Sequence, residues 1–284
     1  MINKKLILII LLALMIIAVL IIYLSQNLHR VFVKEVKHGF ELDSPAEVSI
    51  LGQEDIIHLP KPVQKYLLYT GAVGKEKVHN IKVVADGEIK LNEKWCKVNI
   101  DQYNFLGSHL SRLFYLNVKG YVLPIYGLHS YTDKQASMLV KFGGLIPAVN
   151  AKGEEMRISD TITLLNDMCI FAPASLVDSR IQWEPIDDRT VKAIFKTKYC
   201  TVSANLYFNE KGELVNFSSQ DRYCLEEDGS CKKVKWSTPL KNYRYINGLL
   251  LASCVEAVWN YPQGDDCYIK VTNIKELKYN CDSF

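Results

Sequence analysis

The sequence predicts a mainly β protein of the α+β kind: one strongly curved antiparallel sheet, or unclosed β-barrel, with two or three covering helices and a transmembrane helix before it. Three observations lead to this fold class. Apolar and polar residues alternate along several segments, as in strands with one buried face. Turn residues separate these segments. One uncharged apolar run lies near the N-terminus.

The apolar run covers residues 6–24, with the sequence LILIILLALMIIAVLIIYL. A helix of this length is roughly 28 Å long, close to the hydrocarbon thickness of a bilayer. Residues 1–5 form a short basic tail, and no small-residue cleavage pattern follows the run, so we expect an uncleaved anchor; a cleaved signal peptide is the alternative. A short basic tail usually stays in the cytoplasm. This predicts a single-pass protein of the cell membrane with an extracytoplasmic C-terminal domain.

Residues 25–57 are expected to form a connector with a short helix. The letters SPAE, which begin at Ser44, combine an N-cap, a helix-start proline and an acid three residues after the cap. The next stretch, LPKPVQKYLLYTG, predicts a helix over residues 61–70. Its apolar residues recur on one helix face, and Gly71 suits the end of a helix.

Residues 58–284 are expected to form a single domain around the sheet. Neighbouring strands are rotated by about 20–25°, so a sheet of roughly nine to eleven strands should curl strongly. The segment 249–259 is apolar on both faces, which predicts a central strand after the hairpin signal Asn247-Gly248. The alternating segments are residues 81–91, 95–100, 136–142, 191–196 and 200–208.

The concave face of such a sheet is apolar and needs a cover. The letters SDTITLLNDMCIFAP predict a helix over residues 160–169, with Ser159 as its cap and Pro173 as its stop. We expect this helix and the helix over residues 61–70 to plug the concave face of the sheet.

Four stretches occur in this order along the chain: LPKPVQKYLLYTGAVGK, YVLPIYGLHSYTDKQASMLVKFGGL, TVSANLYFNEKGELVNF and WSTPLKNYRYINGLLL. Together they resemble an uncharacterised bacterial family that carries a domain of unknown function, often behind one membrane helix. Its signatures here are LPxxVQxYLxYTG and WSTPxxxYxxxNG. The resemblance covers most of residues 55–280 and implies no activity. The element order also looks like the unclosed β-barrel of bacterial lipoprotein carriers and sorting factors, from which function does not follow.

The pattern of reactive residues argues against several function classes. The net charge is +3, and basic and acidic residues are interleaved, so no basic stripe for nucleic acid is present. The six histidines lack metal-ligand spacing. The nucleophile motif G-x-S-x-G does not occur. The sequence therefore assigns no metal, cofactor or catalytic residue.

The eight cysteines contain no C-x-x-C pair. Cys224 and Cys231 flank the turn-like segment LEEDGS, and in an oxidising compartment a hairpin there could join them by a disulfide. The alternative is that most of the cysteines are small buried hydrophobic residues.

Aromatic and basic residues give the remaining signal. Arg222 lies in the letters DRY, and this pattern first suggests ordinary sheet packing, with Arg222 paired to Asp221 or to a carboxylate across the strands such as Glu256. The sharper interpretation is a pocket in which Arg222 meets an anionic headgroup while aromatic side chains line an apolar moiety. The predicted ligand-binding residues are Tyr66, Tyr131, Trp183, Arg222, Trp236, Glu256 and Trp259.

The function that these observations favour is a membrane-anchored, non-catalytic domain that binds a lipid or another amphipathic molecule at the cell envelope. The expected partners are the membrane, through residues 6–24, and that small molecule. One alternative is an envelope enzyme of the hydrolase type that uses acids such as Glu155, Asp160 or Glu256. Another is a structural or interaction domain without a ligand.

Overall fold

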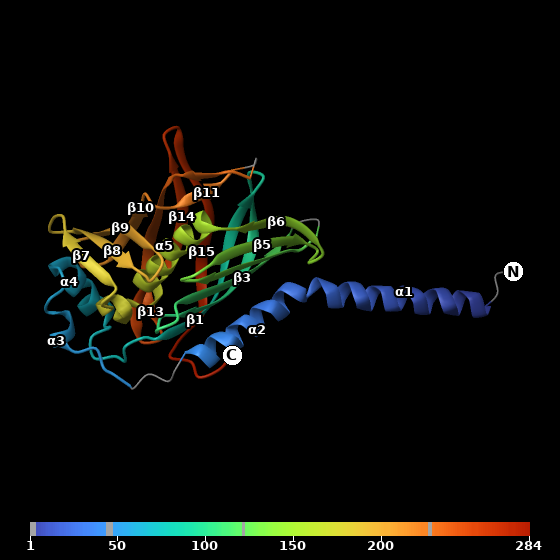
Figure 1. Ribbon diagram of the computed structural model, residues 1–284, viewed down its shortest axis with the longest axis horizontal. Helices are drawn as coiled ribbons and strands as arrows, with labels where there is room; N and C mark the ends of the chain where they lie inside the picture. Colours follow the sequence, from blue (N-terminus) through green and yellow to red (C-terminus); the bar gives the residue numbers. More distant parts are fainter. Residues whose placement is uncertain (1–3, 44–47, 121–122, 227–228) are drawn as a thin grey trace.

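One large antiparallel sheet dominates the computed structural model, which describes residues 4–43, 48–120, 123–226 and 229–284 (Figure 1). Within these residues thirteen strands form the sheet, in the order β6-β5-β4-β3-β2-β1-β15-β14-β13-β10-β9-β8-β7. Neighbouring strands pair antiparallel throughout, and β6 and β7 are the two edges of a sheet that does not close. The predicted fold class is therefore confirmed.

The helices and strands have the following bounds. The helices are α1 (Lys4–Ser25), α2 (Asn27–Leu42), α3 (Gln53–Ile56), α4 (Lys61–Thr70), α5 (Glu154–Phe171) and the 3-10 helix η1 (Pro173–Val177). The strands of the first half are β1 (Asn80–Leu91), β2 (Lys94–Phe105), β3 (Ser111–Lys119), β4 (Ile125–Thr132), β5 (Ala136–Phe142) and β6 (Ile146–Lys152). Those of the second half are β7 (Ile181–Pro185), β8 (Thr190–Lys196), β9 (Thr201–Phe208), β10 (Leu214–Ser219), β13 (Lys235–Ile246), β14 (Leu249–Tyr261) and β15 (Gly264–Tyr279). The strands β11 (Tyr223–Leu225) and β12 (Cys231–Lys233) form a separate hairpin.

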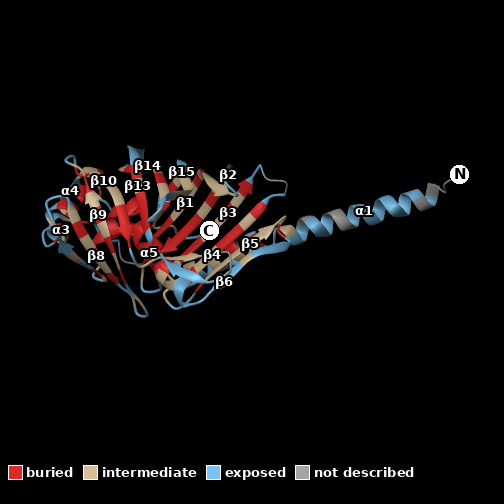
Figure 2. Ribbon diagram, turned by 90° about the horizontal axis from the view of Figure 1, so that it is seen from above, coloured by how far each residue is buried: buried red, intermediate tan, exposed pale blue. Residues whose placement is uncertain are grey.

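Helix α5 lies in the trough of the curved sheet (Figure 2). It packs against β4, β5 and β6 from the first half of the sheet and against β9 and β14 from the second half. Its residues from Ser159 to Phe171 are all buried. The helix begins at Glu154, earlier than the predicted start, because Glu154 and Glu155 suit the positive end of the helix dipole. Ser159 is thus an interior residue and not the cap.

Helix α2 covers the opposite, convex face of β2, β3 and β4. Its buried residues Leu28, Phe32 and Val36 are four positions apart and share one helix face. The ring of Phe32 is fully buried, with its centroid 5.5 Å from that of Tyr115 and 6.1 Å from that of Tyr103. Residues 27–42 read as part of a polar connector, so α2 is not among the predicted helices. The predicted helix start at residues 44–47 lies outside the described residues.

The two covers, α2 and α5, explain why the sheet has more strands than expected. Along β3, Arg112, Phe114 and Leu116 line the concave side, whereas Leu113 and Tyr115 pack beneath α2. A strand that is covered on both faces shows little alternation of apolar and polar residues. For this reason β3 is missing from the segments predicted by alternation.

Helix α4 has the predicted bounds and packs against β8, β14 and η1. Its Tyr66 hydroxyl donates a hydrogen bond of 2.7 Å to the backbone carbonyl of Cys169, near the end of α5. Gly71 follows in the left-handed conformation, with φ at 73°, and ends the helix as predicted. Helix α4 therefore holds the C-terminal end of α5 in place.

Helix α1 extends away from the sheet (Figure 1). Among the described residues, one helical segment is long and apolar enough to cross a membrane, and α1 forms its apolar part. This is a statement about length and composition only, and a signal sequence has the same properties. At its end, the turn between β5 and β6 comes very close: a Cβ atom added to Gly144 would lie 2.1 Å from the carbonyl oxygen of Ser25. The next two residues of that turn region, Leu145 and Ile146, are exposed.

Replacing Phe32 by Ala should destabilise the protein, because the buried ring leaves a cavity between α2 and the sheet. We expect the free energy of unfolding to fall by about 3–5 kcal/mol. Chemical denaturation of the full chain in detergent, followed by circular dichroism, measures this change. The control is Leu68→Ala on the exposed side of α4, which should change it by less than about 0.5 kcal/mol. Equal effects of the two variants would contradict the packing of α2.

Candidate functional site

A cavity of about 430 Å³ lies between α5 and the concave face of the sheet. This volume is within the range of pockets that bind small molecules. Most of its wall is apolar, and strands from both halves of the sheet contribute to it. Representative wall residues are Val83, Leu116, Ile125, Val140, Val255 and Ile269.

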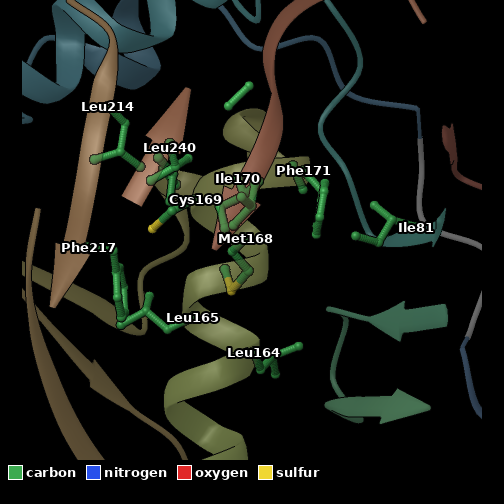
Figure 3. Packing of buried hydrophobic residues seen from close by; sticks show 14 of the residues in the cluster. Ile81, Leu164, Leu165, Met168, Cys169, Ile170, Phe171, Leu214, Phe217 and Leu240 are labelled. Carbon is green, nitrogen blue, oxygen red and sulfur yellow. The ribbon is translucent and has the colours of Figure 1, made fainter. Parts of the chain in front are cut away.

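Helix α5 turns its polar face toward this cavity. Five polar residues in the buried part of α5 recur at a spacing that puts them on one side of the helix, and these five line the cavity. The opposite side packs into the apolar core, where Figure 3 shows Leu165 and Met168 among side chains of the neighbouring strands. The polar lining residues of α5 are Ser159, Asp160, Thr163, Asn166 and Asp167.

Asp167 is held in a closed polar network. Its Oδ2 atom accepts hydrogen bonds from Gln102 at 2.8 Å, from Asn104 at 3.1 Å and from Arg112 Nε at 2.6 Å. All four side chains are buried. The Arg112 guanidinium also lies 4.7 Å from the ring centroid of Phe114. The charge of Asp167 is thus compensated within the protein, which points to a structural role.

Arg222 occupies an aromatic corner of the cavity. Its guanidinium carbon lies 4.1 Å from the ring centroid of Trp236 and 5.4 Å from that of Trp259. Tyr268 completes the corner by stacking on Trp259, at 5.7 Å between centroids, and by accepting a hydrogen bond of 3.1 Å from Trp236 Nε1. Arg222 donates from Nη1 to the Thr163 hydroxyl, whereas its buried Nε has no hydrogen-bond partner among the residues that the structure describes.

The two carboxylates suggested as partners of Arg222 are engaged elsewhere. Asp221 accepts a hydrogen bond of 2.9 Å from the Ser203 backbone N–H and lies 3.4 Å from Lys233 Nζ. Glu256 lies 3.7 Å from Lys241 Nζ. In the described part of the chain no carboxylate lies within ion-pair distance of Arg222, so its positive charge is left uncompensated.

The β11–β12 hairpin covers part of the cavity. Its residues that line the cavity are Tyr223, Cys224 and Leu225. The Tyr223 backbone N–H donates a hydrogen bond of 2.9 Å to the Ser159 hydroxyl and so ties the hairpin to α5. Burial raises the pKa of the Cys224 thiol, against the opposing effect of the Tyr261 hydroxyl, which lies 3.3 Å from Sγ. Cys224 therefore stays protonated near neutral pH and lacks the activation of a nucleophilic cysteine.

Cys224 and Cys231 are both free thiols in this structure. The hairpin register pairs Cys224 with Lys232 and Cys231 with Leu225. Neighbouring positions of a strand point to opposite faces, so the two thiols lie on opposite sides of the hairpin. A disulfide between them would need a different register.

The structure brings three of the seven predicted binding residues together at the cavity: Arg222, Trp236 and Trp259. The other four do not line it. Tyr66 is buried against α5, and Glu256 pairs with Lys241. The remaining two are Tyr131, which accepts a hydrogen bond from Thr161 and lines a separate groove beside α2, and Trp183, which is half-buried on the edge strand β7.

Several cavity residues are missing from the predicted site, among them Asp167, Arg112 and Thr163. The sequence does carry a signal for those on α5, because its polar residues recur at helical spacing within an otherwise apolar segment. The acids named for an enzyme also separate: Asp160 lines the cavity, whereas Glu155 is exposed.

Comparison with protein families shows what the chain is related to. Residues 49–271 match the family of unknown function DUF6544. The chain belongs to this family, and the resemblance to a family of unknown function is confirmed. A comparison with curated proteins finds no match.

Solved structures resemble the chain weakly. A domain described as an outer membrane lipoprotein-sorting protein, from Vibrio parahaemolyticus, has a TM-score of 0.38 and 8% identity, over 71% of this chain and 85% of that one. A DUF1329 family protein from Desulfovibrio piger has a TM-score of 0.38 and 10% identity, over 86% and 93%. A LolA superfamily protein from Nitrosomonas europaea has a TM-score of 0.34 and 10% identity, over 82% and 95%.

The Asp167→Asn variant should be strongly destabilised, because Arg112 would then be a buried charge without a compensating partner. Breaking a buried ion pair costs about 3–5 kcal/mol. Denaturant unfolding of the full chain measures the loss. The matched control is Glu184→Gln, which removes an exposed ion pair with Lys192 at 3.3 Å and should leave the unfolding midpoint unchanged. A midpoint for Asp167→Asn equal to that of the control would show that the network contributes little.

Proposed function

We propose that this member of the family binds a lipid or similar amphipathic molecule, without catalysis, in the cavity between α5 and the sheet. The observation that supports it most is Arg222: a cation without a carboxylate partner in the described residues, placed in a mostly apolar and aromatic cavity. An anionic headgroup would compensate the charge of Arg222, and an apolar chain along the sheet would contact the apolar wall.

The energetics of Arg222 support an anionic ligand group. A charge that is moved out of water loses hydration, and this loss is large unless the charge is paired and hydrogen-bonded. The contacts with Trp236 and Trp259 compensate for part of the loss, since an arginine over an aromatic face gains about 0.5–2 kcal/mol. The buried Nε still has a hydrogen atom to donate. A phosphate or carboxylate oxygen would accept it.

The apolar wall suits a hydrocarbon chain. Each methylene group that leaves water for an apolar site gains about 0.8 kcal/mol. The wall residues come from β1, β3, β4 and β5 as well as from β14 and β15, so a chain in the cavity would contact both halves of the sheet. A ligand with one polar end and one apolar end fits this arrangement better than a fully polar one.

In this proposal the chain is anchored at the cell envelope. Residues 6–24 cross the membrane after the basic tail of residues 1–5. Residues 25–57 connect this segment to residues 58–284, which act as one binding domain on the extracytoplasmic side. The support is the length and apolar character of α1 and the exposure of its side chains, such as Leu8 and Ile9.

The acids at the cavity favour binding over hydrolysis. An acid–base mechanism of the glycosidase type needs two carboxyl groups free to exchange protons. Of the two aspartates that line the cavity, Asp167 is fixed by Arg112 and two amides. Among the described lining residues this leaves Asp160, and one carboxyl group does not make such a pair.

The test is binding of octyl phosphate to the full chain in phosphatidylcholine nanodiscs, followed by tryptophan fluorescence and corrected with empty nanodiscs. We expect saturable binding that Arg222→Gln weakens about tenfold or more, as expected for the loss of a hydrogen bond to a charged group. Binding of 1-octanol, which has the same chain without the anion, should not change.

The matched control is Arg244→Gln, an exposed arginine on β13 that bonds to Asn273 at 3.0 Å, away from the cavity. It should bind octyl phosphate like the unmodified protein. The proposal is wrong if octyl phosphate shows no saturable binding, or if the variants at Arg222 and Arg244 bind it equally well.

A further inference from the structure

A second polar position in the cavity has unused bonding capacity. Asp160 lies on α5 and is 1% exposed, and it lines the same cavity as Arg222. Its Oδ2 atom has no hydrogen-bond partner within the described residues. Its Oδ1 atom lies 3.9 Å from His129 Nδ1, which is beyond hydrogen-bond distance. Asp160 is therefore a buried acceptor that faces the cavity and is incompletely satisfied.

Among the described residues, the charged groups that line the cavity come in equal numbers. They are two arginines and two aspartates, together with His129. Arg112 and Asp167 compensate each other at 2.6 Å. Arg222 and Asp160 remain, and in the described residues they form no ion pair with each other. The ion-pair contact of Asp160 there is with His129, whose Nδ1 lies 3.9 Å from Oδ1 and carries a charge only when the imidazole is protonated. Among the described lining residues the cavity thus presents a cation without a carboxylate partner, Arg222, and a carboxylate with an unbonded oxygen, Asp160 Oδ2.

These two groups belong to neighbouring positions of the cavity wall along α5. Arg222 is hydrogen-bonded to Thr163, which follows Asp160 by three positions. Side chains at this spacing are neighbours on a helix, with Cβ atoms about 5–6 Å apart. One headgroup that carries both a negative and a positive charge could therefore contact both groups.

We infer that the ligand headgroup is a compact zwitterion, with an anion on Arg222 and a primary ammonium on Asp160. This inference rests on the proposed function and names the class of amphipath. Phosphoethanolamine has the required form, since two carbons separate its phosphate from its ammonium. The ammonium donates to Asp160 Oδ2, and the phosphate accepts from Arg222 Nε.

A purely anionic headgroup fits the cavity less well. It would compensate Arg222 but leave the Asp160 carboxylate buried near a second negative charge. Two neighbouring negative charges in a site of low dielectric repel each other, and an unpaired buried charge is costly. The ammonium removes both penalties at once.

The experiment compares two octyl phosphodiesters that differ in one group. One is octyl phosphoethanolamine, and the other carries 2-hydroxyethyl in place of aminoethyl. Both are titrated into the full chain in phosphatidylcholine nanodiscs. We expect the unmodified protein to bind the amine about tenfold more tightly, as for one hydrogen bond between charged groups. In Asp160→Asn the ratio of the two affinities should fall to about one.

Asp188→Asn, at an exposed turn position, is the matched control and should keep the tenfold ratio. Each variant is judged by the ratio of its affinities for the two phosphodiesters. A variant that fails to fold would bind neither of them, so misfolding is not mistaken for a changed ratio. Equal affinities in the unmodified protein, or an unchanged ratio in Asp160→Asn, overturn the inference. Failure of the proposed function is distinct, since neither phosphodiester would then bind saturably.

Discussion

The polar face of α5, turned toward the inside of a curved sheet, is the constraint from which the rest of the structure follows. A helix in an apolar trough would ordinarily be apolar on the side that meets the sheet. Here Asp167 binds Arg112 and two amides from β2 and β3, and these bonds set the rotation of the helix about its axis. That rotation directs Asp160 and Thr163 into the cavity and leaves Leu165 and Met168 for the core.

Local periodicity predicted much of the fold. Strands with one wet face alternate clearly, and the helix over residues 61–70 has the predicted bounds because its apolar stripe and Gly71 mark both its face and its end. The elements that the alternation of apolar and polar residues did not predict include β3 and α2. β3 lies between α2 and the cavity, so both its faces are apolar. α2 buries three residues along sixteen and otherwise reads as a polar connector.

The site was predicted only in part, because composition does not tell which side of a sheet an aromatic residue faces. Trp236 and Trp259 pair directly across β13 and β14 and reach the cavity together, with Arg222 above them. The sequence does not distinguish Tyr66 from these two tryptophans, yet its hydroxyl donates a hydrogen bond to the backbone carbonyl of Cys169 in α5. The partners of Asp167 lie 55 to 65 positions earlier in the chain, and no local pattern links residues that far apart.

The contact between Gly144 and Ser25 couples the tilt of the apolar N-terminal helix to the rim of the sheet. A side chain at this position would collide with the helix end, and the positive φ of 72° also disfavours any residue other than glycine. If α1 crosses a bilayer, this junction places Leu145 and Ile146 at the depth of the lipid headgroups. The strands that begin and end at this turn, β5 and β6, carry the cavity-lining residues Val140 and Val149, so the cavity wall would then continue from the bilayer surface.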